Sequence, residues 1–588
     1  MLRCVAGGGR VSCRVYDGHC RWVSVISSLA LRLSLSLPLS SRTHTRTHPL
    51  IAAVSLSFVH ALSSTDQEYY AIQEAWAREG YTVLSYETRG WDGVGGAIGT
   101  AGPADVKDHK AVVDYLVAHA STYSVDIARF GNAGVSYGAG IASITAALDP
   151  RIKAVASLSG WGNLTSALYG AETVSSFWGD VLVESGGALG KEPQELLAQW
   201  KHLNEHTNVA GVRAWADNRS VLMYIDQLCG NGRSTPVFVS SNVEDRLFKP
   251  DYAADYRDAL VGSGCETKLL FNQGIHASAE ILDLVGITTN STVWYDTLQW
   301  FENHLKKKKK KKENNKEAVN GAVTIDVRKH GLLQAAKRLT FPSALTANKD
   351  WMDSTILRRY SLGAAASGPG AIIPGAGVLL PQSDAARLSE KLKLNDESVR
   401  SIHFTNTSGL TAGVPIVSEI LQVFVDVPII TDLASLDSKV AALWVLDSLS
   451  PLDGADAAGG AEGHTICGTP SLSLQIKARS SSPNVQIFAY LYDILIPNTA
   501  MGIAKTKVEG TLLTHGPRTV WGGVGTFSGV WRTVPLRFRS MCWVVEKGHT
   551  IALGIALAEA SMYGTANAAS DLEVDVRLNE SKLVLPVL

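Results

Sequence analysis

The sequence predicts an α/β domain built on a parallel sheet, followed by an all-β domain. Residues 50–305 alternate between short β-prone runs and helical patterns, which is typical of a parallel sheet covered by helices. Beyond about residue 320, helical periodicity fades and β-prone segments with turn residues dominate, which favours a β-sandwich over residues 320–588. The 588 residues also exceed what one hydrophobic core usually organises, so at least two domains are expected.

The elements of the first domain follow from apolar periodicity. The first helix is expected to begin at Thr65, whose spacing to Glu68 suits a capping box, and to end at Gly80. Before it, the apolar run from Ile51 to Leu62 is expected to form a buried strand. Further strands are expected at 81–86, 130–133, 154–158, 236–240 and 268–271, and further helices at 106–117, 139–148, 251–260 and 294–305. The polar-speckled helical residues 161–232 interrupt this alternation, and we expect them to form an inserted cap.

Two segments are expected to lie outside the folded domains. Residues 1–49 are rich in Ser and Arg and nearly free of acids, so we expect a disordered N-terminal extension, either an organellar transit peptide or translated upstream sequence. The run Lys306 to Lys312 repels itself, so residues 306–319 are interpreted as a solvated linker. A nuclear-localisation or polyanion-binding role is the alternative for this run.

Composition excludes several classes of protein. The formal net charge is −1, so neither nucleic acid nor an anionic membrane is expected as a partner. The seven cysteines are too sparse for a disulfide scaffold. The sequence contains no CxxC pair that would indicate a zinc site. No apolar run reaches the roughly 18 residues of a spanning helix. We therefore expect a soluble protein, cytoplasmic or organellar, with a small molecule or a peptide as its substrate; the sequence does not indicate its oligomeric state.

One motif carries the chemistry of the first domain. The string Gly134-Val135-Ser136-Tyr137-Gly138 follows a predicted strand and opens a predicted helix. A GxSxG string in that place is the nucleophile elbow of an α/β-hydrolase fold, in which the serine hydroxyl is exposed at the carboxyl edge of the sheet. The sequence therefore predicts Ser136 as a nucleophile, with the backbone N–H of Tyr137 as an oxyanion donor.

A serine nucleophile needs a histidine to remove its proton and a carboxylate to orient that histidine. In the α/β-hydrolase order these follow the serine along the chain. Asp245 comes just after the predicted strand 236–240, and His276 comes just after the strand 268–271. Glu244 is the rival acid. This chemistry implies no cofactor and no metal.

Several linked blocks between residues 59 and 305 carry a family resemblance. They are Glu79 to Tyr86 with Arg89-Gly90, Ala101 to Val106, Gly134 to Gly140, Asp149 to Val155, Leu158 to Trp161, Asp245 to Pro250, and Gly274 to Ala277. The chain thus resembles the Xaa-Pro dipeptidyl-peptidase and cocaine-esterase-like (CocE/NonD) branch of the α/β-hydrolases. The resemblance implies nucleophile, acid and base at Ser136, Asp245 and His276.

The resemblance also extends to the second domain and to the substrate. Ala489 to Asp493 and Lys547 to Ile551 are similar to the jelly-roll sandwich that follows the hydrolase domain in this family. The chain has no HGGG-type oxyanion loop, so by position His60, in the loop His60 to Ser64, is expected to supply the second oxyanion donor. The family activities implied are dipeptide release from an Xaa-Pro N-terminus, or hydrolysis of small esters and amides. The resemblance therefore implies a peptide or a small ester or amide as substrate.

Two alternatives of other classes stay open at this point. His202-Leu203-Asn204-Glu205-His206 fits the HxxEH spacing, which on a helix places two histidines on one face for zinc with the glutamate as base. The second alternative is a catalytically inactive member whose β-sandwich binds a partner or a carbohydrate.

Overall fold

The fold is described from a computed structural model of the chain. It describes residues 2–7, 10–15, 23–27, 51–58, 70–91, 94–284, 292–306, 321–329, 337–341, 356–365, 373, 376–382, 399–403, 429–446, 463–479, 484–495, 508–522, 529–559, 562–564, 566 and 572–588. The chain divides into two compact units. Unit 1 comprises residues 1–167, 178–324 and 340–349, and unit 2 comprises 168–177, 325–339 and 350–588.

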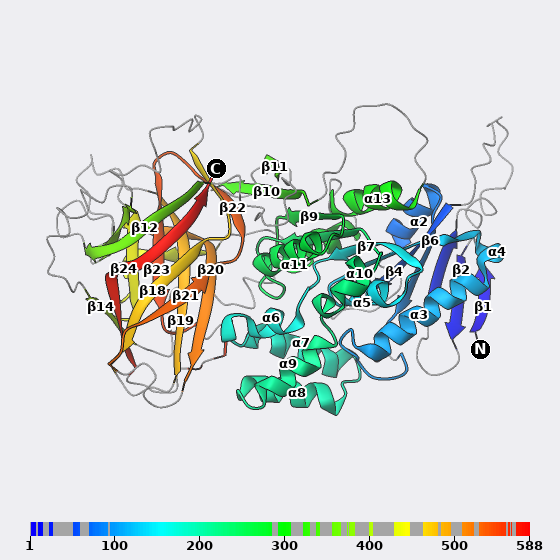
Figure 1. The fold of residues 1–588 in the computed structure, drawn as a ribbon, viewed down its shortest axis with the longest axis horizontal. Helices are drawn as coiled ribbons and strands as arrows, with labels where there is room; N and C mark the ends of the chain where they lie inside the picture. Colours follow the sequence, from blue (N-terminus) through cyan, green and yellow to red (C-terminus); the bar gives the residue numbers. More distant parts are fainter. Residues whose placement is uncertain are drawn as a thin grey trace. The chain divides into compact units, whose positions relative to one another are not determined.

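Unit 1 is built on a parallel sheet. Its parallel strands are β4 (Ile51–Phe58), β5 (Thr82–Glu87), β6 (Val125–Val135), β7 (Ile152–Leu158), β8 (Val237–Asn242) and β9 (Thr267–Asn272). They pair in the spatial order β5–β4–β6–β7–β8–β9. Every residue of β8 is buried, as expected of a strand covered by helices on both faces. The predicted strands of this domain, including the one from Ile51, are confirmed (Figure 1).

Helices cover this sheet. They are α2 (Tyr70–Arg78), α3 (Pro103–Ala118), α4 (Ala120–Tyr123), α5 (Tyr137–Leu148), α11 (Pro250–Gly262), α12 (Ser278–Leu284) and α13 (Thr292–Leu305). The Trp76 ring on α2 packs edge-on against Trp294 and Phe301 of α13, with ring centroids 6.0 and 5.9 Å apart. These aromatic side chains belong to the buried core of the unit. The start of the first helix predicted at Thr65 lies outside the described residues.

The N-terminal residues differ from their prediction. Strands β1 (Leu2–Gly7), β2 (Arg10–Val15) and β3 (Val23–Ser27) form an antiparallel series, and β3 pairs antiparallel with β5. The prediction of a disordered extension over residues 1–49 is therefore wrong for these three segments. Low acid content suggested a targeting peptide, but polar and apolar residues alternate along Arg10–Val15, which is a strand pattern.

Residues 161–232, predicted as a cap, contain several short helices. They are α6 (Leu164–Tyr169), η2 (Gly170–Glu172), α7 (Ser176–Leu189), α8 (Gln194–Asn204), α9 (Val209–Asp217), η3 (Val221–Tyr224) and α10 (Ile225–Cys229). Residues 168–177 belong to unit 2. There the Gly564 amide donates to the Val174 carbonyl over 3.0 Å, and the Thr173 and Thr519 hydroxyl oxygens lie 2.8 Å apart. Residues 168–177 lie in the sequence between two segments of unit 1, so a domain boundary placed at one point of the sequence does not reveal that they belong to unit 2.

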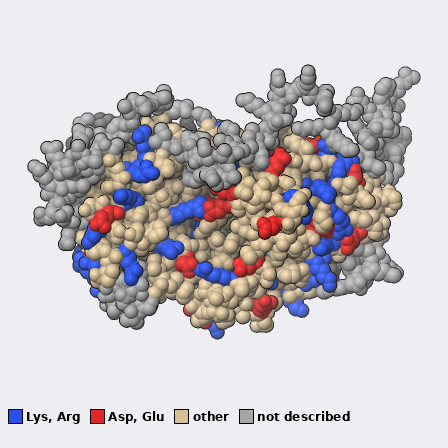
Figure 2. Space-filling view, viewed as in Figure 1, with Lys and Arg blue, Asp and Glu red and all other residues tan. Residues whose placement is uncertain are grey.

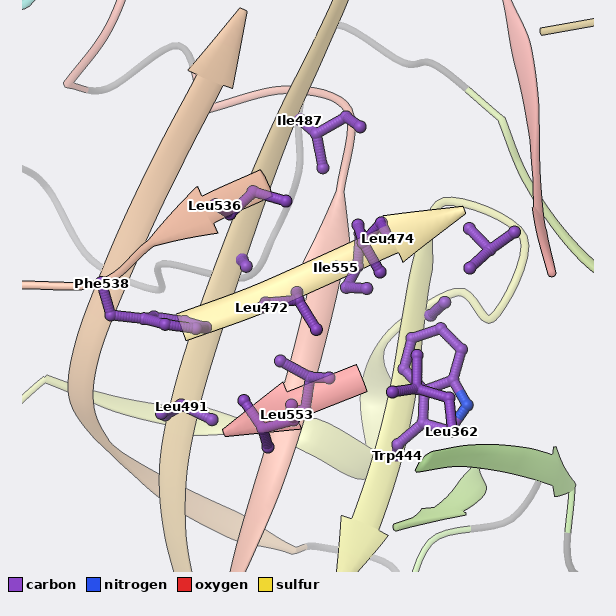
Figure 3. Close-up of a cluster of buried hydrophobic side chains, with 14 of the residues drawn as sticks. Leu362, Trp444, Leu472, Leu474, Ile487, Leu491, Leu536, Phe538, Leu553 and Ile555 are labelled. Carbon is purple, nitrogen blue, oxygen red and sulfur yellow. The ribbon is translucent and has the colours of Figure 1, made fainter. Parts of the chain in front are cut away.

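The described chain after residue 320 is almost entirely β structure. Its strands are β10 (Val323–Lys329), β11 (Lys337–Phe341), β12 (Ile356–Ala365), β13 (Gly377–Pro381), β14 (Val399–His403), β15 (Ile430–Asp432), β16 (Ala441–Leu446), β17 (His464–Gly468), β18 (Ser471–Ala478), β19 (Asn484–Leu495), β20 (Glu509–Trp521), β21 (Arg532–Arg537), β22 (Met541–Val545), β23 (His549–Ala556) and β24 (Glu573–Val587). Strand β18 alternates buried and less buried positions, and Leu472 and Leu474 point into a core that also contains Trp444 and Leu553 (Figure 3). The predicted β-rich C-terminal domain is confirmed.

The surface of the described residues is mixed in charge. Lys and Arg side chains are interspersed with Asp and Glu over the face shown in Figure 2. Within the described part of the chain, no helix combines the length and apolar character needed to cross a membrane.

Among the residues whose side chains the structure describes, two disulfide bonds are formed, one in each unit. Cys229, at the end of α10, is bonded to Cys265, which precedes β9, and Cys467 is bonded to Cys542 between β17 and β22. The sparse spacing gave no signal for these pairs, because each partner is distant in the sequence.

Replacing the pair in unit 1 is expected to destabilise that unit. The Cys229–Cys265 bond closes a loop of 36 residues. Closing a loop of that size stabilises a fold by roughly 3–4 kcal/mol through the unfolded chain. In urea unfolding, the double variant Cys229→Ser, Cys265→Ser should have a free energy of unfolding of unit 1 that is lower by about that much. The double variant Cys467→Ser, Cys542→Ser is the matched control, because it removes the disulfide bond of unit 2 instead. Alkylation of all seven cysteines in denaturant without reductant would contradict the assignment.

Candidate active site

Ser136 lies on a sharp turn between β6 and α5. Its backbone has φ +56° and ψ −117°, a left-handed conformation that is strained for a residue with a Cβ. Glycine at 134 permits the turn, because a Cβ there would lie 2.2 Å from the Gly138 carbonyl. The Ser136 amide donates to the Leu158 carbonyl of β7 over 2.8 Å. The turn therefore has the strand–turn–helix geometry of a nucleophile elbow.

The structure brings Ser136, His276 and Asp245 together. Ser136 Oγ lies 2.8 Å from His276 Nε2, and His276 Nδ1 lies 2.8 Å from Asp245 Oδ2. The three residues follow the carboxyl ends of β6, β9 and β8, which are parallel and share one edge of the sheet. Asp245 is fully buried and the His276 side chain is 11% exposed, so the ring can meet a substrate while its carboxylate partner is shielded.

The Asp245 carboxylate is held by its own loop. Its other oxygen, Oδ1, accepts the amides of Leu247 and Phe248, each over 2.8 Å. These two bonds fix the carboxylate so that Oδ2 faces the histidine. Glu244 is half-buried, and its amide donates to the Gly274 carbonyl over 3.0 Å. Of the two candidate acids, Asp245 is therefore the one hydrogen-bonded to His276.

Aromatic rings border the histidine. The Phe248 ring meets His276 edge-on with centroids 5.0 Å apart, and the Trp178 ring of α7 does so at 5.9 Å. Trp161 packs against Phe248 at 4.9 Å. The environment of the imidazole is thus apolar on these sides, which strengthens electrostatic interactions within it.

The predicted oxyanion donor lies beside the serine. Tyr137 is the first residue of α5, and amides of a helix's first turn have no acceptor within the helix. The Tyr137 hydroxyl donates to Asp105 Oδ2 over 2.8 Å and accepts the Gly99 amide over 3.2 Å, so the side chain is fixed as well. His60, the expected second donor, lies outside the described residues.

Asp105 is a buried carboxyl that the sequence analysis did not single out. The Gly102 amide donates to its Oδ2 over 3.1 Å, in addition to the Tyr137 hydroxyl. Burial raises the pKa of Asp105 to about 6, against the lowering effect of the Tyr137 hydrogen bond. Burial and the neighbouring Asp105 carboxylate both raise the pKa of Tyr137, so its hydroxyl stays a donor.

The unfolding free energy should therefore depend on pH through Asp105. Between about pH 4 and 6 the native carboxyl keeps a proton that the unfolded chain has lost, so stability falls as pH rises through this window. The shift corresponds to roughly 3 kcal/mol at neutral pH. Urea unfolding at pH 4 and pH 7 measures this. From pH 4 to pH 7 the unfolding free energy of Asp105→Asn should rise relative to that of the native chain by an amount of that order, because the variant has no carboxyl group at this position. An identical difference at both pH values would contradict this account.

The zinc alternative is not supported by the helix that should carry it. Helix α8 ends at Asn204, so Glu205 and His206 lie beyond its last residue, and His206 has φ +50°. His202 and His206 are consequently not on one helical face, as the HxxEH arrangement requires. His202 Nδ1 instead lies 2.9 Å from Thr207 Oγ1. The described residues contain no cluster of three or more His, Cys, Asp or Glu side chains suited to a metal ion.

Comparison with known proteins agrees with this architecture. Residues 30–278 match the family model described as X-Pro dipeptidyl-peptidase (S15 family). No curated protein matches the chain. The match confirms the resemblance seen in the sequence.

Solved structures are similar over nearly the whole chain. A CocE/NonD family hydrolase from Staphylococcus aureus is 11% identical with a TM-score of 0.57, covering 98% of this chain and 94% of its own. An aminopeptidase from the marine sediment archaeon Thaumarchaeota archaeon is 10% identical with a TM-score of 0.60, covering 100% and 96%. An α-amino acid ester hydrolase labelled with selenomethionine is 12% identical with the same TM-score and coverage. The α/β-hydrolase-like fold with a C-terminal β-rich region is confirmed, while the jelly-roll assignment stays a prediction.

Proposed function

We propose that this chain, with its match to the S15 family model, is a serine hydrolase that cleaves ester or peptide bonds through an acyl-enzyme. The observation that carries the proposal is the pair of 2.8 Å contacts that links Ser136 Oγ to His276 Nε2 and His276 Nδ1 to Asp245 Oδ2. The first distance suits a hydrogen bond along which the Ser136 proton moves to His276, and the second suits a hydrogen bond that orients the imidazole.

The three triad residues and the Tyr137 amide have distinct roles in the proposed reaction. His276 Nε2 takes the Ser136 proton as Oγ attacks the substrate carbonyl carbon, and Asp245 stabilises the imidazolium that forms. The Tyr137 amide donates to the oxyanion. His276 then gives the proton to the leaving amine or alkoxide, which leaves Ser136 acylated. A water molecule, deprotonated by His276, attacks the acyl carbon. The bond between the acyl carbon and Ser136 Oγ then breaks, His276 returns the proton to Oγ, and the acid is released.

For the substrate, we propose an Xaa-Pro N-terminal peptide, with a small ester or acyl compound as the second candidate. The aromatic edges of Trp178 and Phe248 beside His276 favour an apolar group next to the scissile bond. A proline ring satisfies this requirement, and so does the acyl or alcohol part of a small ester. The family match supports the first candidate, since its printed description is X-Pro dipeptidyl-peptidase.

A paired substrate panel separates these candidates. The panel compares Gly-Pro-anilide with Gly-Ala-anilide, and both with p-nitrophenyl butyrate, by kcat/KM. A preference for the proline compound over its alanine counterpart supports the dipeptidyl-peptidase proposal, whereas turnover of the ester alone supports the second candidate. If no compound turns over and a fluorophosphonate does not label the chain, the serine-hydrolase proposal fails and a binding protein is favoured.

A further inference from the structure

A fully buried carboxyl group lies one helical turn beyond the histidine. Glu280 is 0% exposed, and it sits on α12, which begins two residues after His276. Its Oε1 accepts the hydroxyls of Ser159 and Ser240 over 2.9 and 2.6 Å, and its Oε2 accepts the side-chain amide of Asn242 over 3.0 Å. All of these donors are neutral.

The donors belong to the two strand ends that hold the rest of the triad. Ser159 directly follows Leu158, whose carbonyl accepts the Ser136 amide over 2.8 Å. Asn242 ends β8, and its carbonyl accepts the Asp245 amide over 3.0 Å. The Asn242 side-chain amide also donates to Ser159 Oγ over 2.9 Å, which closes the network between the two strands.

The network is buried throughout. Asn242 is 0% exposed, and Ser159 and Ser240 are each 1% exposed. Ser159 itself has φ +46°, so its backbone is held in a left-handed conformation at this point. A buried carboxylate is costly unless its oxygens are hydrogen-bonded, so removing one acceptor leaves a donor without its partner.

We propose that Glu280 is a positioning residue, which ties the His276 loop to the ends of β7 and β8 and thereby sets the Ser136–His276 and His276–Asp245 distances. The proposal rests on the proposed serine-hydrolase function. Glu280 acts through its three side-chain donors and does not meet the substrate. Small displacements of reacting groups are sufficient to lower rates substantially.

The test is a double-mutant cycle between Glu280 and Asn242. Glu280→Gln replaces one acceptor oxygen with a donor, so the cluster loses one hydrogen bond. Asn242→Asp alone places a second carboxyl group beside that of Glu280, and it removes the amide that donated to Glu280 Oε2. Each variant should lower kcat on the order of 10- to 100-fold per folded molecule with little change in KM. In the double variant the new amide on α12 can donate to the new carboxylate at the end of β8. The hydrogen bond is then restored with its direction reversed, so much of the activity should return.

Thr297→Val is the matched control. Thr297 is also fully buried in unit 1, but its hydroxyl donates only to the Val293 carbonyl of its own helix over 2.7 Å. This variant should cost stability and leave kcat per folded molecule unchanged. If Glu280→Gln behaves like Thr297→Val, or if the double variant shows the product of the single effects, the positioning role is wrong.

A readout without turnover keeps this test separate from the proposed function. In protein labelled with ¹⁵N-histidine, the His276 Nδ1–H proton bonded to Asp245 should give a far-downfield resonance that weakens or moves in Glu280→Gln and not in Thr297→Val. An unchanged resonance overturns the role of Glu280. Failure of the native chain to react with a fluorophosphonate would instead overturn the proposed function and leave the resonance result standing.

Discussion

Ser136→Ala is expected to lower kcat by at least about 10⁴-fold, because the reaction loses its nucleophile while the binding surface stays intact. The measurement is steady-state turnover of whichever panel compound the native chain hydrolyses, together with labelling by a fluorophosphonate. Labelling should disappear completely, whereas the folded state should persist, since Ala removes only the hydroxyl. KM is expected to change little.

Ser185→Ala is the matched control for this substitution. The Ser185 hydroxyl donates to the Val181 carbonyl of its own helix over 2.6 Å, away from the triad residues in the hydrogen-bond network. Its kcat should stay within about twofold of the native value, as expected of a small substitution at a half-buried position whose side-chain hydrogen bond stays within its own helix. Equal labelling of native chain and Ser136→Ala would show that another residue is the nucleophile.

Asp245→Asn should lower kcat by roughly 10⁴-fold with KM nearly unchanged, because an amide no longer holds the imidazole in the tautomer that accepts the serine proton. In the native chain, Asp245 Oδ1 accepts hydrogen bonds from the backbone amides of Leu247 and Phe248. The side-chain oxygen of asparagine can accept the same two hydrogen bonds, so the loop should remain folded. The measurement is kcat and KM between pH 6 and 9.

The neighbouring acid supplies the control for this prediction. Glu244→Gln changes a half-buried side chain in the same loop, and its kcat should stay within about threefold of the native value. A loss in Glu244→Gln with activity retained in Asp245→Asn would assign the acid to Glu244 instead.

Much of the fold could be predicted from local sequence. The parallel strands are apolar runs bounded by turn residues, and each of them, such as Thr82–Glu87 and Val237–Asn242, lies close to its predicted position. The N-terminal strands were missed because composition was given more weight than the alternation of polar and apolar residues in Arg10–Val15. The assignment of residues 168–177 to unit 2 depends on contacts such as Val174 with Gly564, which no local pattern records.

The site was predictable where chemistry is tied to chain order. Ser136, Asp245 and His276 could be proposed because each follows a strand of the parallel sheet, and parallel strand ends converge at one edge. Residues that act through other residues left no comparable signal. Asp105 and Glu280 are ordinary acids on helices, and only the three-dimensional structure shows that they are buried against Tyr137 and Asn242. The spacing of Glu280, four residues after His276, is the one feature that could have drawn attention to it.

The left-handed backbone of Ser136 has a consequence for selection on this protein. A side chain at φ +56° costs of order 1 kcal/mol, which glycine does not incur. Ser136→Gly is therefore expected to melt at a higher temperature than Ser136→Ala, although neither has a nucleophile. Screening for thermal stability alone would favour glycine at this position and discard the hydroxyl, so a serine here persists only while its chemistry is under selection.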